Sequence, residues 1–65
     1  MKVYTVETYY NGVEIIFDTL EKAKAYIAEH HDDWIMCGEY STCYSYVFNV
    51  NDEWPTAWLG WFEVQ

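Results

Sequence analysis

Apolar and polar residues alternate in the first part of the chain, and one strong turn signal interrupts them. Residues 2–10 are rich in β-branched and aromatic side chains, which favour extended strands. Asn11-Gly12 follows, a pair typical of the two-residue type I′ hairpin turn, in which both central residues have positive φ. The apolar residues of the next segment share one predicted face: Val13, Ile15 and Phe17. The pattern therefore predicts a β-hairpin.

A helical pattern replaces this alternation at residue 18. Asp18 and Thr19 are both good N-cap residues, and Asp18 with Glu21 has the spacing of a capping box. One stripe then recurs at helical spacing: Leu20, Ala23, Ile27 and His30, with Tyr26 beside it. Because the helix macrodipole disfavours anions at the C-terminus, the acidic pair at 32–33 predicts a helix end near residue 30 or 31.

The second half of the chain carries further strand patterns. Residues 34–37 form a short apolar run, and residues 43–50 alternate after an intervening turn. Two forms of this turn are open. A three-residue loop sets Cys37 opposite Cys43, whereas a two-residue turn sets Cys37 opposite Tyr46.

A polar loop over residues 51–56 leads to a last predicted strand over 57–64. Its side chains divide between two faces, with Trp58, Phe62 and Val64 on one and Leu59, Trp61 and Glu63 on the other. We therefore expect residues 1–65 to form a single α+β domain in ββαβββ order. It would be a small antiparallel β-sheet of four to five strands with one α-helix packed on one face. Since one helix covers only one face, one set of rings on the last strand must face solvent.

Composition adds an unusual pairing of aromatic rings with negative charge. The 65 residues include fourteen aromatic side chains, eleven acids and three lysines, and the formal net charge is -8. From Ala25 to Gln65 there are seven acids and no Lys or Arg. A domain of this size buries a small core, so fourteen rings exceed what one thin layer needs. We infer that at least one aromatic patch contacts a partner.

Several classes of function have no support in the sequence. No G-x-S-x-G, P-loop or H-E-x-x-H motif is present, so we expect neither enzyme activity nor a cofactor. The run His30 to Asp33 lacks two histidines at i,i+4 spacing, so we expect no metal. With no export signal or apolar span, we expect a cytoplasmic protein with Cys37 and Cys43 as thiols. A polyanion is repelled by nucleic acids and anionic membranes, so direct binding to either is not expected.

The remaining signal is the array of carboxylates with interleaved rings. Carboxylates on a rigid surface can stand in for phosphates and occupy the positive groove of a basic, nucleic-acid-binding protein or complex. Trp and Tyr would anchor such a contact. The predicted partner-binding residues are Asp32, Asp33, Glu39, Tyr40, Asp52, Glu53, Trp54, Trp58, Trp61 and Glu63. The alternative is a self-associating structural or regulatory domain that forms a homodimer through its aromatic face.

The first part of the chain carries a resemblance to known proteins. The opening KVYTVETYYNG, a second strand ending in Phe and the helix TLEKAKAYI resemble small phage and prophage proteins over Met1 to Ile27. The size, acidity and lack of catalytic motifs are also similar to phage-encoded inhibitors of the anti-CRISPR type. That resemblance implies a non-catalytic inhibitor, acting in the cytoplasm of the host cell, that blocks a CRISPR-type defence complex or another host nucleic-acid enzyme by DNA mimicry. It transfers no individual functional residue.

Overall fold

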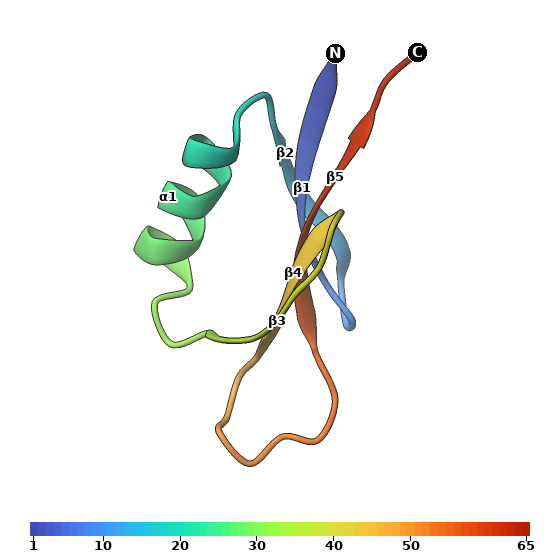
Figure 1. Cartoon of the computed structure of the whole chain (residues 1–65). Helices are drawn as coiled ribbons and strands as arrows, with labels where there is room; N and C mark the ends of the chain where they lie inside the picture. The colour runs from blue at the N-terminus through green and yellow to red at the C-terminus, as the bar shows by residue number, and fades with distance from the viewer.

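Five strands and one helix make up the computed structural model, which describes residues 1–65. Their order is β1 (Lys2–Thr8), β2 (Gly12–Phe17), α1 (Leu20–His30), β3 (Ile35–Glu39), β4 (Cys43–Val47) and β5 (Ala57–Glu63). All five strands join one antiparallel sheet in the spatial order β2-β1-β5-β4-β3, and α1 lies on one side of it (Figure 1). The predicted α+β class, with an antiparallel sheet and one helix, is confirmed.

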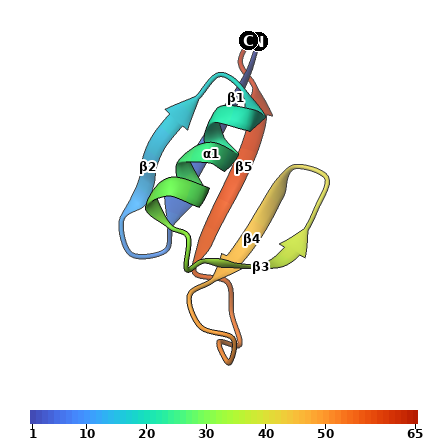
Figure 2. The ribbon, with the colours of Figure 1, turned by 90° about the vertical axis from the view of Figure 1, so that its left-hand side faces the viewer.

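The helix covers only part of the sheet. In Figure 2, α1 lies in front of β1, between β2 and β5, while the β3–β4 hairpin extends to one side. The helix connects β2 to β3, which are the two edge strands. The other face of the sheet carries no helix, and we call it the open face.

The core on the helix side is small and joins α1 to the three inner strands. Its six buried residues are Val6, Ala23, Ile27, Tyr46, Ala57 and Leu59. Leu59 and Trp61 therefore face the helix, which places Trp58 and Phe62 on the open face. This settles which of the two predicted sets of rings lies opposite the helix.

The turn of the first hairpin differs from the predicted type I′ turn. Thr8 pairs with Gly12, which leaves Tyr9, Tyr10 and Asn11 as a three-residue loop. Only Gly12 has a positive φ, of 73°, and the Asn11 amide donates to Thr8 Oγ1 at 3.0 Å. The glycine thus supplies the left-handed residue of a three-residue loop, which is the next commonest hairpin connection.

A β-bulge in β2 makes the predicted face of Val13 wrong. Val6 pairs with Ile15 whereas Glu7 pairs with Val13, so Glu14 is the extra residue. Such a bulge shifts the alternation by one position. Val13 therefore lies on the open face, where it is 54% exposed, and Glu14 turns toward α1.

The second hairpin has the two-residue turn, and a bulge changes its pairing. The Tyr40 amide donates to the Cys43 carbonyl at 2.8 Å, so the turn consists of residues 41–42. Cys37 is the extra residue of a second irregularity, and Met36 pairs with Tyr46 in its place. Neither predicted partner of Cys37 is therefore correct. Both cysteines are free thiols.

The helix begins and ends close to the predicted positions. Thr19 is the N-cap, and its hydroxyl accepts from the Lys22 amide at 3.2 Å. Asp18 pairs instead with the Lys22 ammonium at 3.0 Å. The C-cap is His31, as its position before the acidic pair predicts. His30, however, is exposed, so the buried stripe ends at Ile27.

Candidate protein-binding site

The ten predicted partner-binding residues fall in three places. Asp32 and Asp33 lie in the loop between α1 and β3, and Asp52, Glu53 and Trp54 lie in the loop between β4 and β5, which forms the lower end of the molecule in Figure 1. Glu39 and Tyr40 lie at the tip of the β3–β4 hairpin, and Trp58, Trp61 and Glu63 lie along β5. The structure thus brings half of the set together.

The first group lies beside aromatic residues from three separate loops. Two hollows adjoin there and share Tyr10 and Phe48. Asp52, Glu53 and Trp54 line one hollow with Tyr9, and Asp33 lines the other. We call this region the acidic end: Tyr9, Tyr10, Asp32, Asp33, Trp34, Phe48, Asp52, Glu53 and Trp54.

The loop between β4 and β5 is held by one of its own carboxylates. Asp52 Oδ2 accepts from the Phe48 amide at 3.3 Å and from the Asn49 amide at 3.1 Å. These bonds turn the chain away from the sheet, which explains why β4 ends at Val47 instead of the predicted residue 50. The Asp52 carboxylate is therefore a structural group of the loop.

The rings at the acidic end are open to solvent. Trp54 is 77% exposed, and Tyr9 and Tyr10 are 72% and 73% exposed. The two tyrosines pack edge to face, with ring centroids 5.4 Å apart. We did not predict these tyrosines as contact residues. Their position next to Asn11-Gly12 could have indicated that they are exposed, because side chains in a tight hairpin loop have little sheet to pack against.

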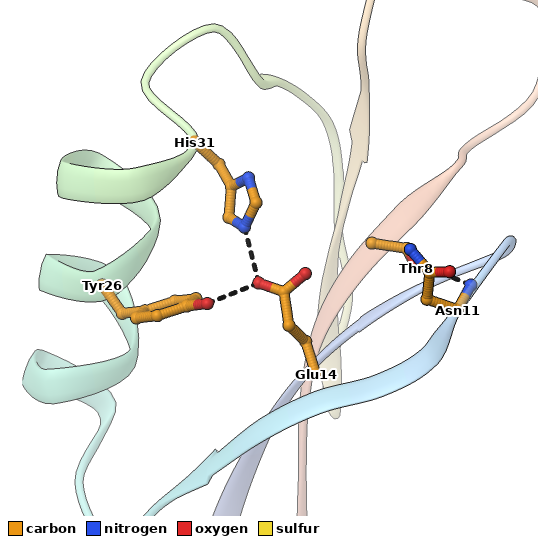
Figure 3. Close-up of polar contacts among 5 residues, drawn as sticks. All are labelled: Thr8, Asn11, Glu14, Tyr26 and His31. Atoms are coloured by element: carbon orange, nitrogen blue, oxygen red, sulfur yellow. Dashed lines mark hydrogen bonds and ion pairs between the residues drawn. The ribbon is translucent and has the colours of Figure 1, made fainter.

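A polar cluster of Glu14, Tyr26 and His31 connects the helix to β2 beside this end (Figure 3). Glu14 Oε2 accepts from the Tyr26 hydroxyl at 2.6 Å and contacts His31 Nε2 at 2.6 Å. The hydrogen bonds from Tyr26 and His31 lower the pKa of Glu14. The same bond from Tyr26 raises the pKa of its phenol, since the proton is held by a carboxylate.

Stacked rings extend this cluster into the acidic end. The His31 ring stacks on Trp34, with centroids 4.0 Å apart and planes 12° from parallel. Trp34 in turn stacks on Phe48 at 5.5 Å. The 31–34 loop and the 48–56 loop are therefore fixed to each other through rings, which gives the acidic end a firm base.

Three carboxylates of the molecule have a cationic partner or a histidine contact, and none of them is among the acids of the acidic end. Asp18 pairs with Lys22 and Glu63 with the N-terminal ammonium, while Glu14 contacts His31. No carboxylate of the acidic end forms an ion pair. The lysines lie in β1 and in the first half of α1, and Lys24 packs over the Tyr44 ring at 5.2 Å. The acidic end thus has negative charge with no adjacent lysine.

The other predicted residues have different surroundings. Trp61 faces the helix and packs half-buried against Tyr4 and Tyr44, with centroids 6.0 and 5.1 Å away. Trp58 lies on the open face, and Tyr40 is 61% exposed with its ring over Gly38. None of these lines the hollows of the acidic end.

No group of three or more His, Cys, Asp or Glu side chains is placed to hold a metal ion. The single helix lacks the length and apolar character needed to cross a membrane. Comparison of the chain with protein families, with curated proteins and with solved structures gave no match.

Proposed function

We propose that this protein is a non-catalytic, acidic inhibitor that binds the nucleic-acid-binding surface of a basic protein or complex. A CRISPR-type defence complex is the proposed class of target, and a phage or other mobile element the proposed source. The observation that carries the proposal is the acidic end, where uncompensated carboxylates lie beside exposed Trp and Tyr rings.

Charge and rings would have separate roles in this contact. The net charge of -8 attracts a basic groove over distances of about a Debye length and raises the association rate. Asp33 and Glu53 would take positions that phosphates occupy in the competing nucleic acid. Trp54, Tyr9 and Tyr10 would supply the desolvated contact, because aromatic anchors account for most hot spots.

Competition against labelled duplex DNA tests the proposal. The DNA is bound to basic nucleic-acid-binding proteins, CRISPR effector complexes among them, and its displacement by the protein is followed by fluorescence anisotropy. A variant with Asp32→Asn, Asp33→Asn and Glu53→Gln should displace DNA about tenfold less well, mainly through a slower association rate. Asp52 is left unchanged because its carboxylate holds the loop.

The matched control removes three carboxylates from other places: Glu7→Gln, Glu21→Gln and Glu39→Gln. Both variants have the same net charge, so a larger loss in the first variant assigns the contact to the acidic end. Equal losses in both variants would mean that net charge alone acts. Failure to displace DNA from any target, or binding that is unaffected by salt, would contradict the mimicry.

A further inference from the structure

The open face of the sheet carries exposed apolar side chains and almost none of the acidic residues. Four large side chains on it are 42–58% exposed: Val13, Ile16, Ile35 and Phe62. Pairing across the strands places Thr5, Cys43 and Trp58 on the same face. Glu7, paired with Trp58, is the charged residue of this face within the strands. An apolar patch of this kind on a small polyanion marks an interaction surface.

Gly60 lies at the centre of the open face, and the fold itself does not require a glycine there. Its φ is not positive, and β5 pairs with both neighbouring strands without a bulge. A Cβ built on Gly60 would meet no atom closer than 3.7 Å. By contrast, a Cβ on Gly38 would lie 2.6 Å from Ser45 Oγ and from the Tyr40 ring.

A glycine inside a strand weakens it, and it often marks a place where another molecule approaches closely. A bulge, positive φ and internal crowding are all absent at Gly60, so the glycine leaves room for close approach by another molecule. Phe62, two residues along β5 on the same face, is a ring of the kind that could fill such a space.

We propose that the open face is the interface of a homodimer in which Phe62 of each copy packs on Gly60 of the other. The two-fold axis lies in the plane between the two sheets, runs perpendicular to the strands and passes over β5 midway between Gly60 and Phe62. Rotation about this axis brings each Phe62 ring onto Gly60 of the partner copy. Because ring and glycine lie on one face of one strand, the surface is complementary to itself, as a two-fold interface requires.

Charge is compatible with this arrangement. Glu7 pairs with Trp58, three residues from the axis, so the two Glu7 carboxylates would lie about 20 Å apart along the strands. That separation exceeds the Debye length of roughly 8 Å at physiological salt. The carboxylates of the acidic end and of α1 lie outside the contact. Two copies still repel through their net charge of -8 each.

The size of the face sets the strength of the dimer. Five strands about 4.8 Å apart and about 20 Å long give a face of roughly 24 by 20 Å. Two such faces cover on the order of 1,000 Å² in total, the lower limit for a specific interface. We therefore expect a weak, reversible dimer.

Sedimentation equilibrium of the full chain, from about 10 µM to about 1 mM, tests this proposal in the range where weak interfaces dissociate. The expected result is a monomer–dimer equilibrium that shifts toward dimer as salt is raised, because salt screens repulsion between two polyanions. Gly60→Ala and Gly60→Val should weaken dimerisation at least about tenfold while the thermal midpoint of the monomer is retained. Phe62→Ser should also weaken it about tenfold, and it decides the matter if Gly60→Val fails to fold.

Trp54→Ser, which removes an even more exposed ring at the acidic end, is the matched control and should leave the dimer intact. The same variant should reduce displacement of DNA from a basic target, and Phe62→Ser should not. The two proposals can therefore fail independently. A chain that stays monomeric at all concentrations and salts, or a dimer that neither Gly60→Val nor Phe62→Ser weakens, would overturn the inference. So would a dimer that strengthens as salt is lowered.

Discussion

At the scale of single residues, Glu14 connects sheet and helix through one carboxylate oxygen. It is the extra residue of the β2 bulge, and the bulge turns its side chain toward Tyr26 and His31. Alternation in the sequence could not show this, because a bulge depends on how two strands pair and not on the order of residues within one of them. The cluster therefore depends on a backbone irregularity.

Replacement of Glu14 by Gln should lower the free energy of unfolding by about 1 kcal/mol at neutral pH, because two hydrogen bonds to a charged, partly exposed acceptor are weakened. The pKa of Glu14 is lowered in the folded protein, so its contribution is fully present above the pKa of the unfolded chain. The contribution is lost as the pH falls through the lowered pKa. Urea unfolding of both proteins between about pH 6 and pH 2.5 should therefore show the difference shrink at the acidic limit. A difference that grows in acid would refute this role.

Gly38 and Gly60 should respond differently to the same substitution. Gly38→Ala places a methyl group 2.6 Å from Ser45 Oγ, a buried atom, and should lower the free energy of unfolding by about 1–3 kcal/mol. Gly60→Ala meets only ordinary contacts and should change it by about 0.5 kcal/mol or less. Chemical denaturation at a low protein concentration, where the chain is monomeric, measures both. Similar losses in the free energy of unfolding for the two variants would mean that the close contacts at Gly38 do not affect stability.

At the scale of elements, the sequence predicted the strands and the helix ends, and it missed the form of the first turn and the irregularities in strand pairing. The helix ends followed from Thr19 and the acidic pair, and the strands from alternation. The predicted face of Val13 and both predicted partners of Cys37 were wrong because each strand contains an irregularity. Five of the nine residues of the acidic end were among the predicted partner-binding residues. The sequence could not show that Asp33, Asp52 and their neighbours lie near Tyr9 and Tyr10, because this proximity depends on the order of the strands in the sheet.

Thr19→Ala tests the local part of this account. The Thr19 hydroxyl accepts from the Lys22 amide, and the loss of this N-cap should lower the free energy of unfolding by about 1 kcal/mol. Thr19→Ser should retain most of the stability because serine offers the same acceptor. Asp18→Ala should have a smaller effect, because the exposed pair with Lys22 contributes little. Thermal unfolding followed by far-UV circular dichroism compares the three variants. A loss of stability for Asp18→Ala that equals or exceeds the loss for Thr19→Ala would mean that Asp18, and not Thr19, is the effective N-cap.

At the scale of the whole molecule, the acidic end and the open face carry different kinds of residue. Acids and exposed rings lie together at the acidic end, whereas Glu7 is the one acid on the strands of the open face. Composition revealed the excess of acids and rings but not this arrangement, because the arrangement depends on which face the helix covers. It is compatible with the two proposals, a basic partner at the acidic end and a second copy on the open face.

The excess of acids should make folding sensitive to salt. Eleven acids against three lysines repel one another in the compact state, so screening by NaCl should raise the free energy of unfolding. An increase of about 1 kcal/mol corresponds to a midpoint about 4–8 °C higher for a domain of this size. Thermal unfolding at a few micromolar protein avoids any contribution from dimers. The Asp32→Asn, Asp33→Asn, Glu53→Gln variant should show a flatter dependence, and a midpoint that falls with NaCl would contradict this account.

The two chain termini lie side by side at the pole opposite the acidic end, where the Val64 amide donates to the Met1 carbonyl at 2.7 Å (Figure 1). A fluorophore, affinity handle or surface tether attached to either terminus would therefore point away from Trp54 and Asp33. A short peptide bridge between the termini would also yield a circular chain without spanning the molecule. Such a closed ring would keep the acidic end free for measurement.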